Sequence, residues 1–159
     1  MSELSMHELE RLLEIWEAAV RTTHDFLAEE DILFLRPLVR DQYLSSVQII
    51  VARDDKGQIQ GFMGLSGFEQ EKSEAHEEGV YGSSGMIEML FVHPDCHGMG
   101  IGRSLVRIAE SGFQDLFVDV NEQNPGALAF YKRCGFVVVG RSPLDGQGKP
   151  FPLLHMRLA

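Results

Sequence analysis

The chain has 159 residues, with 24 acidic side chains against 14 basic ones and a formal net charge of -10 at pH 7. This length suits one domain with its own core, so we expect a single domain over residues 1–159. The negative charge argues against binding to nucleic acid or to an anionic membrane surface. No stretch has the roughly 20 apolar residues of a membrane span. Two cysteines are too few for a disulfide framework, which favours a cytoplasmic location.

The first elements predicted along the chain are two helices and a hairpin. Apolar residues at helical spacing predict a core-facing helix over residues 6–21. A second helical pattern covers 29–44, and Pro37 predicts a bend in it. Strands at 47–53 and 59–65 follow, and the Asp-Asp-Lys-Gly sequence between them suits a tight hairpin turn.

A polar stretch separates this part from the next regular elements. The strand pattern ends after Gly67, and we expect residues 68–85 to form a surface loop. The elements expected beyond it are strands at 86–92, 115–121, 135–142 and 151–158, and helices at 101–112 and 125–133. The order strand, helix, strand over 86–121 implies a parallel pair. The chain is therefore expected to have a mixed α/β (α+β) fold.

A glycine-rich turn joins the strand at 86–92 to the helix that follows. Gly98, Gly100 and Gly102 are spaced two apart, directly before the amphipathic helix. Glycines at such a point leave the first backbone N–H groups of the helix free to converge on one anion. The turn therefore predicts a ligand that carries phosphate.

Two common phosphate loops do not match this turn. A P-loop requires Gly-x4-Gly-Lys-Ser/Thr, but Arg103-Ser104 follows Gly102 and no lysine is available there. A dinucleotide-binding loop requires glycine at the position that Arg103 occupies. Nucleoside triphosphates and NAD are therefore less favoured, although another nucleotide stays open as an alternative ligand.

Two motifs together resemble the GNAT superfamily of N-acetyltransferases. The Gly-x-Gly-x-Gly turn is similar to the pyrophosphate loop of that family. Residues 124–136 are similar to its Asn-x-x-Ala-x-x-Phe/Leu-Tyr helix, which Gly-Phe follows at the start of the next strand. Stretches at 23–27, 120–124 and 148–154 further resemble the small bacterial YjaB-like acetyltransferases, so the likeness covers nearly the whole chain.

The chain departs from the family pattern at three places. His97 stands where the family usually has Arg or Gln. The stretch before the first helix is short for a full strand, and the loop at 68–85 has the character of an insertion. The first departure concerns a side-chain contact to the cofactor, and the other two concern the rim of the site.

The resemblance implies a fold, a cosubstrate and a set of cofactor contacts. The fold would be a mixed central sheet flanked by helices, with the parallel pair splayed around the cofactor. The cosubstrate would be acetyl-CoA, whose pantetheine arm would lie along Leu90, Phe91 and Val92. The remaining contacts expected around its pyrophosphate and on the later helix are His97, Gly98, Met99, Gly100, Ile101, Gly102, Arg103, Ser104, Asn124 and Tyr131. Arg107, one turn after Arg103, would add positive charge, unless both arginines form a solvated helix face.

The resemblance also implies direct transfer of the acetyl group to an amine. Tyr131 occupies the family position of the acid, and a Tyr hydroxyl with an ordinary pKa of about 10 can protonate a departing thiolate. The alternative is a packing role at the end of the helix. Asn124 is suited to cap the same helix and, in the family, also faces the cofactor.

The residue that takes the proton of the amine is open among three candidates. Glu88 is the first, because a carboxylate in an otherwise apolar strand is unusual, although a solvent-facing edge position would also explain it. His24 is the second: with Phe26 it lies in the loop that, in the family, forms part of the acceptor site. His155 on the last strand is the third.

Three potential metal ligands lie close together before the glycine turn. His93, Cys96 and His97 have ligand-like spacing, but three donors without a Cys-x-x-Cys pair make a metal site improbable, and we expect none. From the family resemblance, the chain is predicted to be an acetyl-CoA-dependent N-acetyltransferase for a small-molecule or protein amine. A CoA-binding regulatory or interaction module without catalysis is the alternative. The sequence indicates neither the acceptor nor the oligomeric state.

Overall fold

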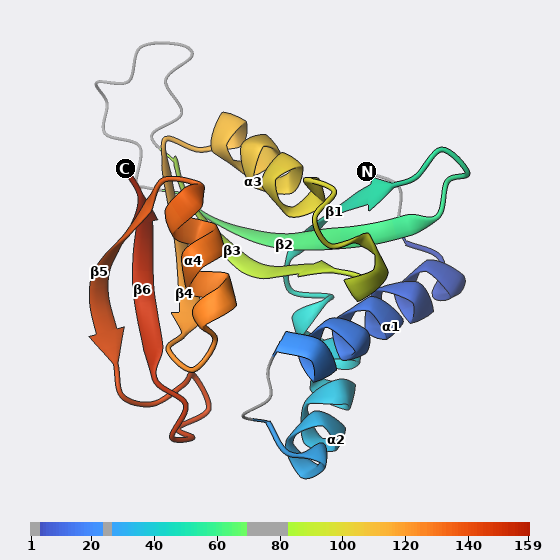
Figure 1. The fold of residues 1–159 in the computed structure, drawn as a ribbon, viewed down its shortest axis with the longest axis horizontal. Helices are drawn as coiled ribbons and strands as arrows, with labels where there is room; N and C mark the ends of the chain where they lie inside the picture. Colours follow the sequence, from blue (N-terminus) through green and yellow to red (C-terminus); the bar gives the residue numbers. More distant parts are fainter. Residues whose placement is uncertain (1–3, 24–26, 70–82) are drawn as a thin grey trace. The chain divides into compact units, whose positions relative to one another are not determined.

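The structure is a computed structural model that describes residues 4–23, 27–69 and 83–159 (Figure 1). Its contacts divide the chain into two compact units. Unit 1 consists of Met1–Gly64 and Met89–Leu105, and unit 2 of Leu65–Glu88 and Val106–Ala159. Along the hydrogen-bonded sheet the strands follow the order β1-β2-β3-β4-β6-β5. None of the helices in the described ranges is long and apolar enough to cross a membrane.

Unit 1 begins with helix α1 (Met6–Thr23), which confirms the first predicted helix. A capping box fixes its start: the Ser5 hydroxyl accepts from the Glu8 N–H at 3.1 Å, and the Glu8 carboxylate accepts from the Ser5 N–H at 3.2 Å. Helix α2 (Glu29–Leu38) contacts α1.

The second predicted helix has the expected extent but two different geometries. After α2 the chain continues as a π-helical turn, Val39–Tyr43, in which the Leu44 N–H donates to the Val39 carbonyl at 3.0 Å. Pro37 lies inside α2 and has no N–H to donate, so the regular ladder is interrupted just before the change.

Strands β1 (Gln48–Arg53) and β2 (Ile59–Glu69) follow, joined by the predicted turn. The Asp54 carboxylate accepts from the N–H groups of Lys56 and Gln58 at 2.8 and 2.9 Å, and Gly57 has a φ of +82°. The core of unit 1 combines apolar side chains of α1, α2, the π-helical turn with the residue after it, and the first half of β2. Its buried members are Leu12, Leu13, Ile15, Trp16, Val20, Ile32, Val39, Leu44, Ile59 and Phe62.

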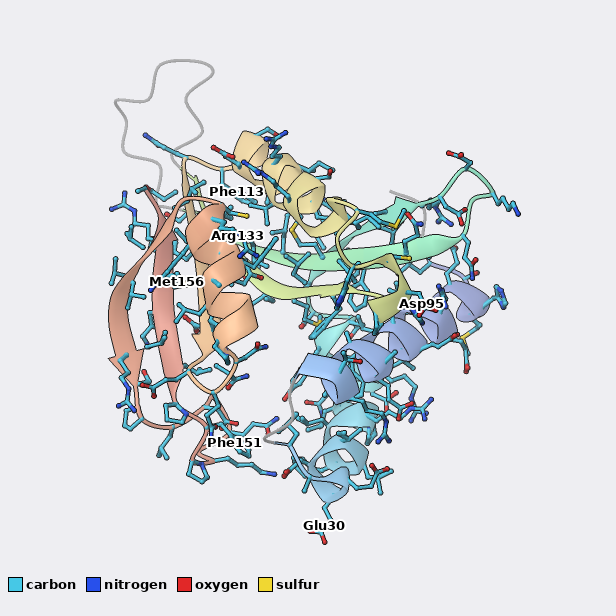
Figure 2. The ribbon with its side chains drawn as sticks, viewed as in Figure 1. Glu30, Asp95, Phe113, Arg133, Phe151 and Met156 are labelled. Carbon is cyan, nitrogen blue, oxygen red and sulfur yellow. The ribbon has the colours of Figure 1, made fainter. Side chains whose placement is uncertain are left out.

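Strands β2 and β3 (Ser83–Val92) are both longer than predicted. The predicted loop boundaries are therefore wrong: residues 68–69 and 83–85 are strand, and 70–82 lie outside the described residues. Gly67 and Gly85 gave the impression of a loop, yet both lie beside the ring of Phe113, which is labelled in Figure 2. A Cβ at Gly85 would be 2.4 Å from that ring. These glycines make room for an aromatic side chain within a sheet.

The remaining elements match the predicted ones closely. They are α3 (Ile101–Gly112), β4 (Asp115–Asn121), α4 (Pro125–Arg133), β5 (Phe136–Ser142) and β6 (Leu153–Leu158). In unit 2, α4 contacts β4 and β5 (Figure 1). Burial alternates strictly along β4, with Leu116, Val118 and Val120 buried, so one face of this strand belongs to the core of unit 2.

The predicted parallel pair is confirmed as β3 with β4. The register runs from Ser84 opposite Asp115 to Ile87 opposite Val118, which is four residues of each strand. Strand β6 pairs antiparallel with both β4 and β5, and an irregularity interrupts the β5 register between Val138 and Gly140.

Candidate active site

The glycine turn belongs to unit 1 and connects the 3-10 turn Pro94–Cys96 to α3. Gly98 and Gly100 have φ values of +81° and +80°. A Cβ built on either residue meets nothing within 4 Å, so the left-handed backbone rather than crowding requires glycine at both positions.

The backbone N–H groups of this turn are available to a ligand. Within the described residues, no acceptor is found for the N–H groups from Gly98 to Arg103, and the next one, Ser104, donates to the Gly100 carbonyl at 3.0 Å. The Ser104 hydroxyl donates to the same carbonyl at 2.9 Å. Free N–H groups at the start of a 12-residue helix favour an anion, so the turn suits the pyrophosphate of acetyl-CoA.

Two arginines of α3 carry the positive charge closest in sequence to this turn. Arg103 and Arg107 are both exposed. Neither takes part in an ion pair with the described residues, whereas several other arginines do. Their charge is therefore not neutralised by a neighbouring carboxylate in that part of the chain, and both remain candidates to contact phosphate.

The strand end predicted to hold the pantetheine arm packs closely against β2. A Cβ at Gly61 would lie 3.0 Å from the Phe91 carbonyl oxygen and 3.2 Å from a methyl carbon of Val92. The His93 N–H donates to the Gln60 carbonyl at 2.9 Å. Gly61 thus lets β2 approach residues 91–92, a function that sequence analysis missed. A glycine inside a strand pattern was the signal that could have revealed it.

The side chain of His97, which replaces the usual Arg or Gln of the family, contacts the backbone of Val92. Its Nε2 lies 3.1 Å from the Val92 carbonyl oxygen, and because a carbonyl only accepts, Nε2 must carry the proton. The side chain is exposed. His97 therefore contacts the end of β3, and its contact with the cofactor stays a prediction.

His93, one of the three residues with ligand-like spacing, also bonds to the backbone. The Nδ1 of His93 accepts from the Asp95 N–H at 3.1 Å and caps the 3-10 turn. No group of three or more His, Cys, Asp or Glu side chains in the described ranges is arranged to hold a metal ion.

Tyr131 lies in unit 2, with 7% of its surface exposed. Its ring meets those of Phe130 and Phe136 edge to face, with centroids 5.0 and 5.4 Å away. Burial, and secondarily the nearby Cys134 thiol, raises the pKa of the Tyr131 hydroxyl well above its ordinary value. The hydroxyl therefore keeps its proton at neutral pH, as a general acid requires.

Asn124 begins the helix that carries Tyr131, as predicted. Its side-chain oxygen accepts from the Ala127 N–H at 3.1 Å, which satisfies one of the first donors of α4. The residue is buried, with 6% of its surface exposed. The capping role is thereby confirmed, and the contact with the cofactor stays a prediction.

Glu88 also belongs to unit 2 and lies just beyond the parallel register. The Ser66 hydroxyl donates to its Oε1 at 2.6 Å, and the side chain is exposed. The pairing of β3 with β4 ends at Ile87 and the Glu88 side chain is exposed, so the alternative of a solvent-facing edge position stays open beside that of a base. Among the residues that the structure describes, the other carboxylate oxygen has no hydrogen-bond donor.

The predicted site residues therefore fall into two groups, one in each unit. Unit 1 contains the residues expected to bind the cofactor from Leu90 to Ser104, and unit 2 contains Glu88, Asn124 and Tyr131. His24 and Phe26, the predicted acceptor-site residues, lie outside the described residues.

Comparison with known families identifies the class of protein. Residues 45–138 match the family model described as "Acetyltransferase (GNAT) domain", which is more than half of the chain. The chain belongs to this family of acetyltransferases, and the assignment made from the glycine turn and the Asn124–Phe136 segment is confirmed.

Individual relatives are similar over almost the whole chain. It is 42% identical to the peptidyl-lysine N-acetyltransferase YjaB of Escherichia coli strain K12 over 153 residues, which are 96% of this chain and 92% of that protein. The protein of the same name from Salmonella typhimurium is 40% identical, over 96% and 93% of the two chains.

Solved structures show the same fold. The solution structure of apo-form YjaB from Escherichia coli superposes with a TM-score of 0.77 at 38% identity, covering 96% of this chain and 92% of that one. A PaiA N-acetyltransferase from Thermoplasma acidophilum, crystallised in complex with coenzyme A, has a TM-score of 0.68 at 21% identity. It covers 98% of this chain and 95% of that one. The predicted mixed fold is confirmed.

Proposed function

We propose that this acetyltransferase transfers the acetyl group of acetyl-CoA to the side-chain amine of lysine in peptides or proteins. The observation that carries the proposal is the 42% identity, over 96% of the chain, to a protein named a peptidyl-lysine N-acetyltransferase. The glycine turn of unit 1, with its free N–H groups, is suited to the pyrophosphate of the cosubstrate.

Acetyl-CoA would supply an acetyl group activated as a thioester. We propose that residues 98–103 hold its pyrophosphate through backbone N–H groups, with Arg103 adding charge. The backbone of Leu90 and Val92 would orient the pantetheine arm. His97 donates to the Val92 carbonyl, whose second lone pair can still accept from the arm. Correct orientation of the two reactants supplies much of the rate.

The proton transfers are assigned to unit 2. We propose that Glu88 takes a proton from the lysine ammonium, through its carboxylate oxygen not bonded to Ser66, so that a neutral amine attacks. Tyr131 then donates its hydroxyl proton to the departing thiolate sulfur. Burial raises the pKa of this hydroxyl, so it carries its proton before the transfer begins.

The family likeness extends across both units, and we propose that residues 1–159 act as one N-acetyltransferase domain. Cys96 and Cys134 are not joined by a disulfide. Their state is compatible with a reducing cytoplasm, which we propose as the location.

The test is an acceptor panel with acetyl-CoA, read as release of the CoA thiol and as acetyl incorporation by mass spectrometry. Lysine peptides are expected to react, and matched peptides with norleucine in place of lysine are expected not to react. Peptides acetylated only at the α-amine, or small amines that react alone, would contradict lysine as the acceptor. Binding of CoA without transfer to any amine would favour a non-catalytic module.

A further inference from the structure

Three polar side chains of unit 2 form a continuous hydrogen-bonded chain that the acetyl transfer does not use. The Nδ1 of His155 lies 2.6 Å from a carboxylate oxygen of Asp119, and its Nε2 lies 2.6 Å from the hydroxyl of Ser142. The residues come from three adjacent strands, β4, β6 and β5. Sequence analysis singled out only His155 among them.

The strand registers explain why these residues meet. Asp119 is paired directly with His155 across β4 and β6, and Gly140 is paired with His155 across β5 and β6. Ser142 lies two residues beyond Gly140 and therefore on the same face of the sheet. A Cβ at Gly140 would be 3.4 Å from the imidazole ring, so glycine leaves the ring space beside this strand.

The chemistry of the donors fixes the direction of the hydrogen bonds. An ionised Asp119 can only accept, so Nδ1 of His155 carries the proton. In the neutral imidazole Nε2 is then an acceptor, and the Ser142 hydroxyl donates to it. This arrangement, with carboxylate, imidazole and hydroxyl in series, is the one by which serine nucleophiles are activated.

The three hydrogen-bonded side chains are accessible to a reactant, and the nearby arginines do not compete for Asp119. The side chains of His155 and Asp119 are 35% and 31% exposed, and Ser142 is half-buried. The nearby arginines are engaged elsewhere: Arg157 pairs with Asp115 at 2.5 Å, and Arg141 with Glu122 at 2.8 Å.

Ser142 differs from the other described serines with side-chain contacts. The Ser5 hydroxyl accepts from the Glu8 N–H, and that of Ser66 donates to Glu88. The other hydroxyls donate to backbone carbonyls: those of Ser45, Ser46, Ser104 and Ser111. Ser142 is the hydroxyl in this set whose partner is an imidazole.

The position of Ser142 separates it from the proposed amine chemistry. His155 on β6 directs Nε2 toward Ser142 on β5, and β5 is three places from β3, the strand of Glu88, in the sheet order. Three strand spacings amount to about 14 Å. The Nε2 of His155 thus points away from Glu88, which argues against His155 as the base of the lysine reaction.

We propose that Ser142, activated by His155 and Asp119, is a second reactive centre that accepts acyl groups from activated esters or thioesters. The Ser142 oxygen forms a bond to the acyl carbon as its proton passes to His155 Nε2. The bond from that carbon to the thiol sulfur or alcohol oxygen breaks, and the leaving group takes the proton from the imidazolium. Water then hydrolyses the acyl-serine, again with His155 as base, so the net reaction is ester hydrolysis.

The test uses the intact protein with a fluorophosphonate probe and with p-nitrophenyl acetate. The Ser142 oxygen would bond to phosphorus as fluoride leaves, and peptide mass spectrometry should locate the label at Ser142, about tenfold or more above Ser111. Ser142→Ala should abolish the label and the p-nitrophenol burst. Asp119→Asn should slow both by about tenfold or more, because it disturbs the imidazole tautomer.

Ser111→Ala is the matched control and should retain full labelling. Each variant should keep the thermal unfolding midpoint shift that acetyl-CoA gives the parent protein, which shows that it is folded. Equal labelling of Ser142 and Ser111, or an unchanged rate in Asp119→Asn, would overturn the proposal. Acetyl transfer to lysine peptides should persist in Ser142→Ala, so its loss would overturn the claim that the two centres are separate.

Discussion

The ring of Tyr131 meets the ring of Phe136 edge to face, with centroids 5.4 Å apart and planes at 78°. Tyr131 lies on α4, and Phe136 is the first residue of β5, so the Tyr-x4-Phe spacing is a packing contact between a helix and the strand after it. This contact fixes the ring of Tyr131 and does not involve its hydroxyl group. Packing and catalysis at Tyr131 can therefore be separated by experiment.

Tyr131→Phe is expected to lower kcat about tenfold to a hundredfold, because it removes the proposed acid, while the ring keeps its contacts. The affinity for CoA and the unfolding midpoint should remain close to those of the parent protein. Steady-state kinetics and a thermal shift with CoA measure both. A parent-like kcat would leave Tyr131 with only its packing role.

The stability of the protein should fall in alkaline solution because of the same residue. The pKa of Tyr131 is raised in the folded state, whereas the unfolded chain ionises near pH 10. Its contribution to stability is therefore complete below about pH 10 and is lost as pH rises from there toward the folded pKa. Urea unfolding from pH 9 to 11 should show a decline of up to about 1.4 kcal/mol per pH unit from this group.

Tyr131→Phe is the control for that decline, because phenylalanine has no hydroxyl to ionise. The variant should lose less stability over the same range than the parent protein. Identical pH dependence in the two proteins would contradict the raised pKa of the buried hydroxyl.

Gly100→Ala should weaken CoA binding by about tenfold, since a left-handed residue with a Cβ costs about 1–2 kcal/mol and the turn would relax away from its shape. Gly148→Ala is the matched control: Gly148 has a φ of +75° and open space around it, but lies in the turn before β6. Both variants should lose stability, and only Gly100→Ala should lose affinity in calorimetry. Equal CoA affinities would show that the turn does not hold the pyrophosphate.

Glu88→Gln should reduce kcat about a hundredfold by removing the proposed base, with little change in the KM for acetyl-CoA. The amide oxygen can still accept from Ser66, so the local contact is retained. Glu110→Gln, on the exposed surface of α3, controls for loss of one negative charge. If both variants turn over lysine peptides at the parent rate, Glu88 is a solvated carboxylate and the base is another group.

Gly85→Ala should destabilise unit 2 by about 1–3 kcal/mol, because the new Cβ would lie 2.4 Å from the Phe113 ring. Gly112→Ala, at the end of α3, meets nothing within 4 Å and should be neutral or slightly stabilising. Chemical denaturation compares the two. Equal midpoints would contradict the close packing of Phe113 on β3.

Local sequence determined most elements and the family. Helices 101–112 and 125–133 were predicted to the residue, because an N-cap asparagine, a glycine turn and regular apolar spacing define them within a few positions. The glycine turn and the Asn124–Phe136 segment likewise carry their chemistry locally. A turn that needs positive φ, and a helix that needs a cap, are visible in consecutive residues.

Tertiary structure decided what depends on residues far apart in the chain. Gly67 and Gly85 indicated a loop, because only the fold places the ring of Phe113 beside both strands. Similarly, Ser142, His155 and Asp119 are separated by 13 and 36 residues, and it is the register of β5, β6 and β4 that joins them. Sequence spacing gives the side of a strand on which a residue lies, but strand pairing selects its neighbours.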